Sequence, residues 1–227
     1  AGLGAWIWTD LIKEMKYPTL AIDFPGRGRH KDIATKNLSL NRYVDSAITD
    51  MKSFAPGKLI IVAHSIGGVV GLEMANILKE RICGFVAVGA SIPAANGSYI
   101  SSFPFFTGMI FRLMIALAGT KPPESALRNG LCNDLTEEQT SKILNLFIPE
   151  SKKLYTDRLS AQKPPHNSMY LRLKKDNAFS ESVQNNMIAN LKTKQIIDIE
   201  SGHLAMLAKP GELANILNGF AAQINEW

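Results

Sequence analysis

The stretch Ile60-Ile61-Val62-Ala63-His64-Ser65-Ile66-Gly67-Gly68 decides how this sequence folds. A β-branched run, typical of a buried strand, leads into a serine flanked by small residues, and a helical pattern follows. This predicts a sharp strand-to-helix turn that exposes the Ser65 hydroxyl above the sheet. Ala63 and Gly67 are expected to pack against each other, so both must be small. The helix would aim its amino end at the site, with the N–H of Ile66 as an oxyanion donor.

On both sides of this turn, short β-branched runs alternate with helical patterns. Such alternation indicates an α/β fold with a mostly parallel central sheet and helices on both faces. The near-continuous apolar character of the second and third runs fits burial on both faces. The expected strands are 17–23, 58–64, 82–89, 168–174 and 194–199, and the expected helices are 40–54, 67–80, 181–191 and 211–225.

The segment from residue 91 to residue 165 breaks this alternation. It shows helical patterns and turns but no strand signal, and it is too long for a simple loop in a compact domain. We therefore expect an α/β core of residues 1–90 and 166–227, with residues 91–165 inserted as a helical cap or lid. The insertion follows a strand whose carboxyl end should lie near the functional site, because ligands bind at that edge of an open α/β sheet.

A serine needs a neighbouring base to become a good nucleophile. Of the four histidines, His203 follows the last expected strand, where a loop can reach the serine. An acid should orient its imidazole, and Asp176 stands after the strand expected at 168–174. With Ser65, these residues give the chain order Ser, Asp, His, which is typical of α/β folds with a nucleophilic serine at such a turn. Asp134, in the expected cap, is the alternative acid.

The other histidines are not expected to act as the base. His64 should point away from the serine along the turn and pack as a support. His30 and His166 do not follow the final strand. Arg27 and Arg29 are interpreted as turn and surface residues, with contact to a substrate carboxylate as the alternative.

These features resemble those of the α/β-hydrolase superfamily. Within it, they resemble the cofactor-free esterase branch, which includes plant methylesterases and hydroxynitrile lyases. The matching stretches are Gly4-Ala5-Trp6-Ile7-Trp8, Asp23-Phe24-Pro25-Gly26-Arg27-Gly28, Ala63-His64-Ser65-Ile66-Gly67-Gly68, Asp176-Asn177-Ala178-Phe179 and Ser201-Gly202-His203. The resemblance implies that the N–H of Ala1 is a second oxyanion donor and that Leu3 contacts substrate. Members usually carry a His-Gly pair just before this point, which would precede residue 1. Lyases of this branch have a lysine after the base, whereas Leu204 stands here, which favours hydrolysis.

The expected activity is hydrolysis of a small-to-medium, hydrophobic carboxylic ester through an acyl-enzyme intermediate, with no metal and no organic cofactor. Apolar residues recur near helical spacing in 102–119, where they form either a substrate-binding lid or a packing face. The substrate contacts expected there are Phe106, Met109, Ile110 and Leu113, and Leu204 is expected to add another. Two alternatives stay open. One is a carbon–carbon hydrolase or hydroxynitrile-lyase-like enzyme on the same triad, and the other is a ligand-binding receptor with little turnover.

Composition limits the kinds of partner that we expect. The 227 residues are 46% hydrophobic and 20% charged, as in a soluble globular protein, and the net charge of +5 has no arginine-rich stripe, which argues against nucleic acid. The longest apolar stretch, 103–119, is short for a membrane span and contains Arg112, so stable insertion is not expected. Cys83 and Cys132 lack metal-ligand spacing and suit a reducing compartment. We expect a cytoplasmic enzyme acting on a small-molecule ester, with a homodimer as an open alternative.

Overall fold

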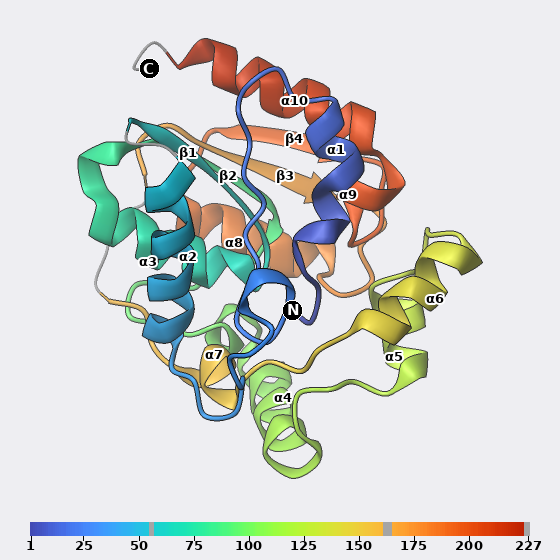
Figure 1. The fold of residues 1–227 in the computed structure, drawn as a ribbon. Coiled ribbons are helices and arrows are strands. Elements are labelled where there is room, and N and C mark those ends of the chain that lie inside the picture. Colours follow the sequence, from blue (N-terminus) through green and yellow to red (C-terminus); the bar gives the residue numbers. More distant parts are fainter. Residues whose placement is uncertain (55–56, 161–164, 225–227) are drawn as a thin grey trace.

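The centre of the fold is a parallel β-sheet (Figure 1). The computed structural model describes residues 1–54, 57–160 and 165–224, and within them the sheet has four strands in the order β1-β2-β3-β4. All three neighbouring pairs run parallel. The strands are β1 Leu59–Ser65, β2 Ile82–Ala90, β3 Ser168–Leu173 and β4 Gln195–Ile199. The predicted parallel α/β architecture is therefore confirmed.

Helices cover both faces of the sheet. Successive side chains of a strand point to opposite faces, so the central strands contribute to two hydrophobic clusters, one on each face. In β2, Phe85 belongs to one cluster and Val86 to the other. In β3, Tyr170 and Leu171 are divided in the same way. The first cluster includes residues of α2 Leu40–Phe54, α3 Gly67–Leu78 and α8 Glu181–Leu191. The second includes residues of α1 Thr9–Lys13, α9 Ala205–Ala208 and α10 Pro210–Gln223. Of the last expected helix, 211–225, residue 225 lies outside the described residues.

The strand expected at 17–23 is wrong. The segment forms neither a helix nor a strand and takes no part in the sheet. A strand needs a partner about 4.8 Å away. Here an apolar cavity of about 490 Å³, lined by Tyr17–Ile22 on one side and by β1 on the other, separates the segment from the sheet. The missing partner explains the absence of a strand.

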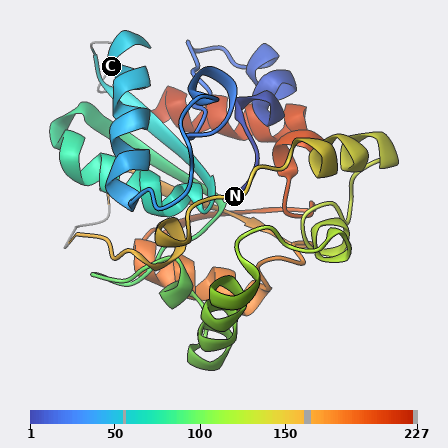
Figure 2. The same cartoon turned by 60° about the horizontal axis from the view of Figure 1, so that its bottom comes forward.

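Between β2 and β3, the described part of the expected insertion (residues 91–160 and 165) forms helices and turns without a strand. Residues 161–164 lie outside the described residues. Its helices are α4 Phe105–Ala118, α5 Glu124–Gly130, α6 Glu137–Leu146 and α7 Lys152–Thr156. Helix α4 projects from the lower edge of the molecule in both views and stands apart from α5 and α6 (Figure 1, Figure 2). No helix of the described chain is long and apolar enough to cross a membrane.

The remaining short elements are 3-10 helices that join the main layers. They span Ala5–Trp8, Gly28–His30, Lys79–Arg81 and Ile100–Ser102. Because all four strands are parallel, their carboxyl ends meet at one edge of the sheet. The loops that follow β1, β3 and β4 carry the residues expected to form the functional site.

Candidate active site

Ser65 lies at the turn between β1 and α3, as predicted. Its φ angle is +52°, in the left-handed region that residues with a side chain rarely adopt. Backbone strain of this kind persists only where the surrounding structure over-determines it, and it is concentrated at functional turns. One such restraint is a hydrogen bond of 2.9 Å from the N–H of Ser91, just after β2, to the carbonyl oxygen of Ser65.

The closest backbone approach at this turn involves Gly68. A Cβ atom on Gly67 would meet nothing within 4 Å, so the expectation that Gly67 packs tightly against Ala63 is wrong. A Cβ atom on Gly68 would lie 2.2 Å from the carbonyl oxygen of Ser91. Glycine is required at position 68 because the first turn of α3 passes directly against the backbone after β2.

The side chains of Ser65, His203 and Asp176 form a hydrogen-bonded series, and all three are buried. Nε2 of His203 lies 2.9 Å from Oγ of Ser65, and Nδ1 lies 2.8 Å from Oδ2 of Asp176. An ionised carboxylate can only accept, so Nδ1 of the imidazole carries a proton. In the neutral ring, Nε2 is then the acceptor for the hydroxyl proton of Ser65. This is the geometry that a general base needs.

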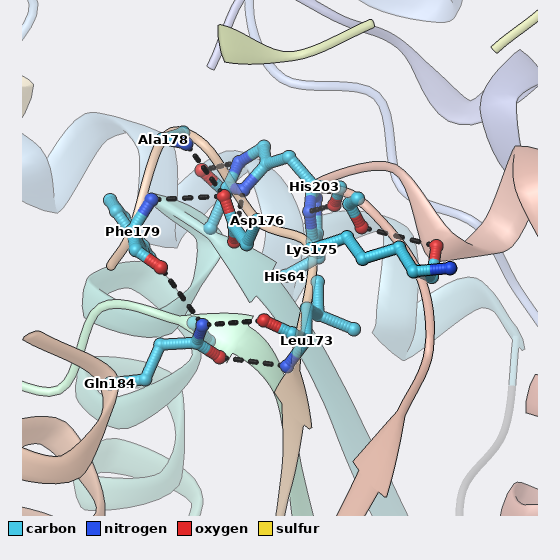
Figure 3. Close-up of polar contacts among 12 residues, drawn as sticks. His64, Leu173, Lys175, Asp176, Ala178, Phe179, Gln184 and His203 are labelled. Atoms are coloured by element: carbon cyan, nitrogen blue, oxygen red, sulfur yellow. Dashed lines mark hydrogen bonds and ion pairs between the residues drawn. The ribbon is translucent and has the colours of Figure 1, made fainter. Parts of the chain in front are cut away.

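The carboxylate of Asp176 is fixed by its own loop (Figure 3). Its Oδ1 accepts hydrogen bonds from the N–H groups of Ala178 at 2.7 Å and Phe179 at 2.9 Å. Because Oδ1 is occupied in this way, Oδ2 is directed at the imidazole. The Phe179 ring also packs edge-on against the His203 ring at 5.3 Å between centroids, so one loop orients both the acid and the base.

Gln184 of α8 braces the same loop and was not predicted from the sequence. Its side chain accepts from the N–H of Leu173 and donates to the carbonyl oxygens of Leu173 and Phe179, each at 2.9 Å (Figure 3). The side chain is fully buried. The available signal was its position beside Val183 on the apolar face of the helix, because a buried polar side chain normally has hydrogen-bond partners.

Asp134, the alternative acid, contacts the base loop rather than the imidazole. Its Oδ2 accepts from the N–H of Gly202 and, at 3.1 Å, from the hydroxyl of Ser201. The neighbouring Asn133 donates to the carbonyl oxygen of Lys175, in the loop that carries the acid, at 2.8 Å. The connection between α5 and α6 therefore holds both of the loops that meet at the triad.

His64 packs beside the triad as a support. Its ring centroid is 4.7 Å from that of His203, and its Nε2 donates to the carbonyl oxygen of His203 at 2.8 Å. Burial, and to a lesser extent the nearby His203, lower the pKa of His64 well below its usual value of 6.5. It is therefore neutral at pH 7, with its proton on Nε2. His30 pairs with Asp50 of α2 at 3.1 Å, and His166 is exposed.

A buried ion pair holds the loop at the start of the chain. Nη1 of Arg27 lies 2.7 Å from Oε1 of Glu150, and both side chains are buried. Arg27 lies in a turn, as expected, but its interpretation as a surface residue is wrong. Burial is tolerated because the two charges pair and also bind backbone. Glu150 accepts from the N–H of Gly2, and Arg27 donates to the carbonyl oxygen of Leu3, each at 2.9 Å. Arg29 is exposed, as expected.

The apolar cavity along β1 reaches His203, whereas Ser65 and Asp176 do not line it. His203 and Leu204 border it, together with Ile66, Ala1 and Leu3. The structure thus brings both expected oxyanion residues and two of the expected substrate contacts to the wall of one cavity. Of the described residues, no group of three or more histidines, cysteines, aspartates or glutamates could hold a metal ion.

The four expected substrate contacts on α4 lie elsewhere. Phe106, Met109, Ile110 and Leu113 are exposed and do not line the cavity that His203 borders. The side of α4 that faces the molecule carries the buried Gly108 and Ile115 and the half-buried Phe111. A helix turns 100° per residue, so these two sets of positions point in different directions.

An aromatic chain, not predicted from the sequence, links the inner face of α4 to the base. The ring centroids of Phe111 and Tyr99 are 6.0 Å apart, those of Tyr99 and Phe179 are 6.2 Å apart, and Phe179 contacts His203. The sequence of 91–165 indicated helical patterns and turns, and no expectation was drawn from it for Tyr99. These rings form an apolar wall on one side of the imidazole.

A parallel sheet with a serine at a strained strand-to-helix turn, and a histidine and an aspartate on later loops, defines an α/β-hydrolase fold. The chain belongs to the alpha/beta hydrolase family, whose model matches residues 1–216. Methylesterase 10 of Arabidopsis thaliana is 27% identical, with 98% of this chain and 89% of that protein covered. Putative methylesterase 19 of the same plant is 24% identical, with 94% and 92% covered. The predicted resemblance to the plant methylesterase branch is confirmed.

Solved structures support the same fold. An extracellular alpha/beta-hydrolase from a Paenibacillus species has a TM-score of 0.83 at 19% identity, with 96% of this chain and 94% of that chain covered. The methylesterase MES16 from Arabidopsis has a TM-score of 0.77 at 20% identity, with 98% and 95% covered. At these identities the likeness concerns the fold alone.

Proposed function

We propose that this chain hydrolyses a small-to-medium, hydrophobic carboxylic ester through an acyl-enzyme on Ser65. The observation that carries this proposal is the series of hydrogen bonds from Ser65 to His203 at 2.9 Å and from His203 to Asp176 at 2.8 Å. The relatives named methylesterase support a carboxylesterase-like hydrolase in general.

The two halves of the reaction use the same three side chains. Oγ of Ser65 attacks the ester carbonyl while its proton passes to Nε2 of His203, and Asp176 stabilises the imidazolium. The tetrahedral intermediate collapses, His203 gives this proton to the leaving alkoxide, and the alcohol departs. Water then attacks the acyl-enzyme with His203 as the base, and the carboxylic acid leaves as Ser65 regains its proton.

The negative charge on the attacked oxygen needs donors that are already in position. We assign this role to the N–H of Ile66, at the amino end of α3, and to the N–H of Ala1. Both residues border the cavity next to His203, and the Arg27–Glu150 ion pair holds the residues that follow Ala1. The helix dipole of α3 adds to this stabilisation.

Leu3 and Leu204 are the side chains that we assign to substrate contact, because they line the cavity that His203 borders. Both are apolar, which suits a hydrophobic ester. Leu204 directly follows the base and offers no cation for a cyanide leaving group, so hydrolysis is favoured over hydroxynitrile cleavage.

Labelling with a fluorophosphonate tests the nucleophile, because the probe reacts with an activated serine and not with an inert pocket. We expect one adduct, on the peptide containing Ser65, and an unlabelled serine would favour the receptor alternative.

A series of esters from acetate to octanoate tests the apolar pocket. A steady fall in activity with acyl length would contradict it, and cleavage of cyanohydrins without ester hydrolysis would contradict the reaction type.

A further inference from the structure

Helix α4 has an apolar outer face that the described chain leaves uncovered. Its members are Phe105 (79% exposed), Phe106 (73%), Met109 (54%), Ile110 (57%), Leu113 (59%), Met114 (52%) and Leu117 (80%). The opposite side of the helix is apolar as well, through Phe111 and Ile115. A helix that is apolar all round is normally buried, and a continuous exposed apolar patch marks an interaction site.

The surroundings of this face are basic. The chain contains no Asp or Glu from residue 82 to residue 123. Four exposed cations lie at α4. Arg112 is on the helix, and Lys121 follows its end by three residues. Nζ of Lys152 donates to the carbonyl oxygen of Ala116 at 2.8 Å, and Arg158 lines the same shallow hollow as Arg112.

No carboxylate of the described residues forms an ion pair with any of these four cations. By contrast, the half-buried Arg128 of α5 pairs with both Glu124 and Glu137. The positive charge next to the apolar face of α4 is therefore not neutralised within the protein, and it favours a partner with negative charge.

We propose that the outer face of α4 docks on an anionic lipid surface. Its apolar side chains would enter the boundary between head groups and acyl chains, while the four cations meet the lipid phosphates. With 14 residues, α4 is about 21 Å long, so it would lie in the plane of the surface and not cross it. The position of α4 at the edge of the molecule leaves this face accessible (Figure 1, Figure 2).

Charge favours lipid over a second copy of the chain. A two-fold dimer brings the same surface of both copies together. Contact through α4 would place one set of four unneutralised cations against an identical set, and like charges repel. An anionic bilayer also offers an apolar region for these side chains, and its surface charge is opposite to that of the four cations.

Flotation of the full chain with vesicles tests the docking. We expect binding to vesicles of phosphatidylcholine mixed with phosphatidylglycerol, weak binding to phosphatidylcholine alone, and release as the salt concentration rises. The double variant Phe105→Asp/Leu117→Gln should lower the bound fraction about tenfold or more, because it removes apolar area at both ends of the face. Asp is compatible with the first turn of a helix, so the fold should survive.

The matched control is Ile77→Gln on α3, an isoleucine that is 53% exposed away from α4. This variant should bind vesicles like the wild-type chain. Absence of binding by the wild-type chain would overturn the proposal, as would equal binding to neutral and anionic vesicles. A dimer in sedimentation experiments that the double variant dissociates, without any vesicle binding, would assign the face to self-association instead. None of these results depends on ester hydrolysis.

Discussion

The loops around the triad and the outer face of α4 differ in the contacts that their side chains make. At the loops, polar side chains make specific hydrogen bonds: Asp176 accepts two from backbone N–H groups besides its contact with His203, and Oδ2 of Asp134 binds the base loop. On the outer face of α4, exposed apolar side chains have no such partners. A buried polar group that loses its partner costs free energy, whereas an exposed apolar side chain can change with little effect. Substitutions should therefore separate the two regions sharply.

The largest effect is expected at the nucleophile. Ser65→Ala removes the proposed nucleophilic oxygen, so kcat should fall about 10⁶-fold while the fold is kept. Steady-state hydrolysis of a short soluble ester measures the loss, and circular dichroism checks the fold. Ser101→Ala, which changes an exposed serine of the insertion, is the control and should leave kcat unchanged. A Ser65→Ala variant with wild-type kcat would remove the proposed mechanism.

The next largest effect is expected at the acid. Asp176→Asn keeps the shape but offers an amide donor to the imidazole, which favours the wrong tautomer of His203, so kcat should fall about 10⁴-fold. Asp198→Asn is the control, because Asp198 lies on β4, at the exposed edge of the sheet, and pairs there with Arg172 of β3. If both variants lost activity equally, the role of Asp176 in orienting the base would be refuted.

A moderate effect is expected where the insertion holds the base loop. Asp134→Ala leaves the N–H of Gly202 without its acceptor and removes one of the two acceptors of the Ser201 hydroxyl, so the imidazole should be less well positioned. We expect kcat to fall roughly 10- to 100-fold with little change in KM, because small misplacements of a catalytic group are costly. Glu138→Ala, an exposed acid on α6, should not change kcat. Equal losses in both variants would point to a general effect of the insertion.

A smaller effect concerns pH and His64. Its pKa is lowered in the folded chain, so below about pH 6.5 the unfolded chain binds a proton that the folded chain does not. Stability should then fall with decreasing pH by up to about 1.4 kcal/mol per pH unit, and this contribution should be absent above that range. Urea unfolding of wild type and His64→Gln across this range measures the difference. Parallel pH curves for the two chains would contradict the buried neutral state of His64.

The smallest effect is expected on α4. Leu117→Gln changes an exposed side chain, so hydrolysis of a soluble ester should stay within about twofold and the free energy of unfolding within about 0.5 kcal/mol. Ile115→Gln, two residues earlier but buried, should cost about 2–4 kcal/mol because it removes apolar contacts and buries an amide. Similar unfolding curves for the two variants would show that the inner and outer faces of α4 are not distinct.

The local sequence pattern was sufficient to predict much of the fold. The helices predicted at 40–54 and 181–191 agree with α2 and α8 to the residue, and the strands that became β1 to β4 agree to within one residue at each end. The chain order of Ser65, Asp176 and His203 pointed to their convergence, because the carboxyl ends of parallel strands meet at one edge. These features depend on residues close together in sequence and on one topological rule.

Other features depended on contacts between distant parts of the chain. The burial of Arg27 follows from Glu150, more than one hundred residues later in the sequence. The segment 17–23 has the composition of a strand and lacks a neighbouring partner, which composition cannot reveal. Periodicity identified α4 as apolar without indicating which of its sides meets the body of the molecule.

By itself, then, the sequence determined the strand-to-helix turn at Ser65, the chain order of the four strands that form the sheet, and the three residues whose side chains form the hydrogen-bonded series. Only the tertiary structure decided that Asp134 and Gln184 brace the triad loops, that Arg27 is a buried ion-pair partner, and that the outer face of α4 is exposed. The reason is physical. Strand and helix patterns arise from neighbouring residues, whereas burial and hydrogen-bond partners are set by whatever surface the folded chain brings alongside.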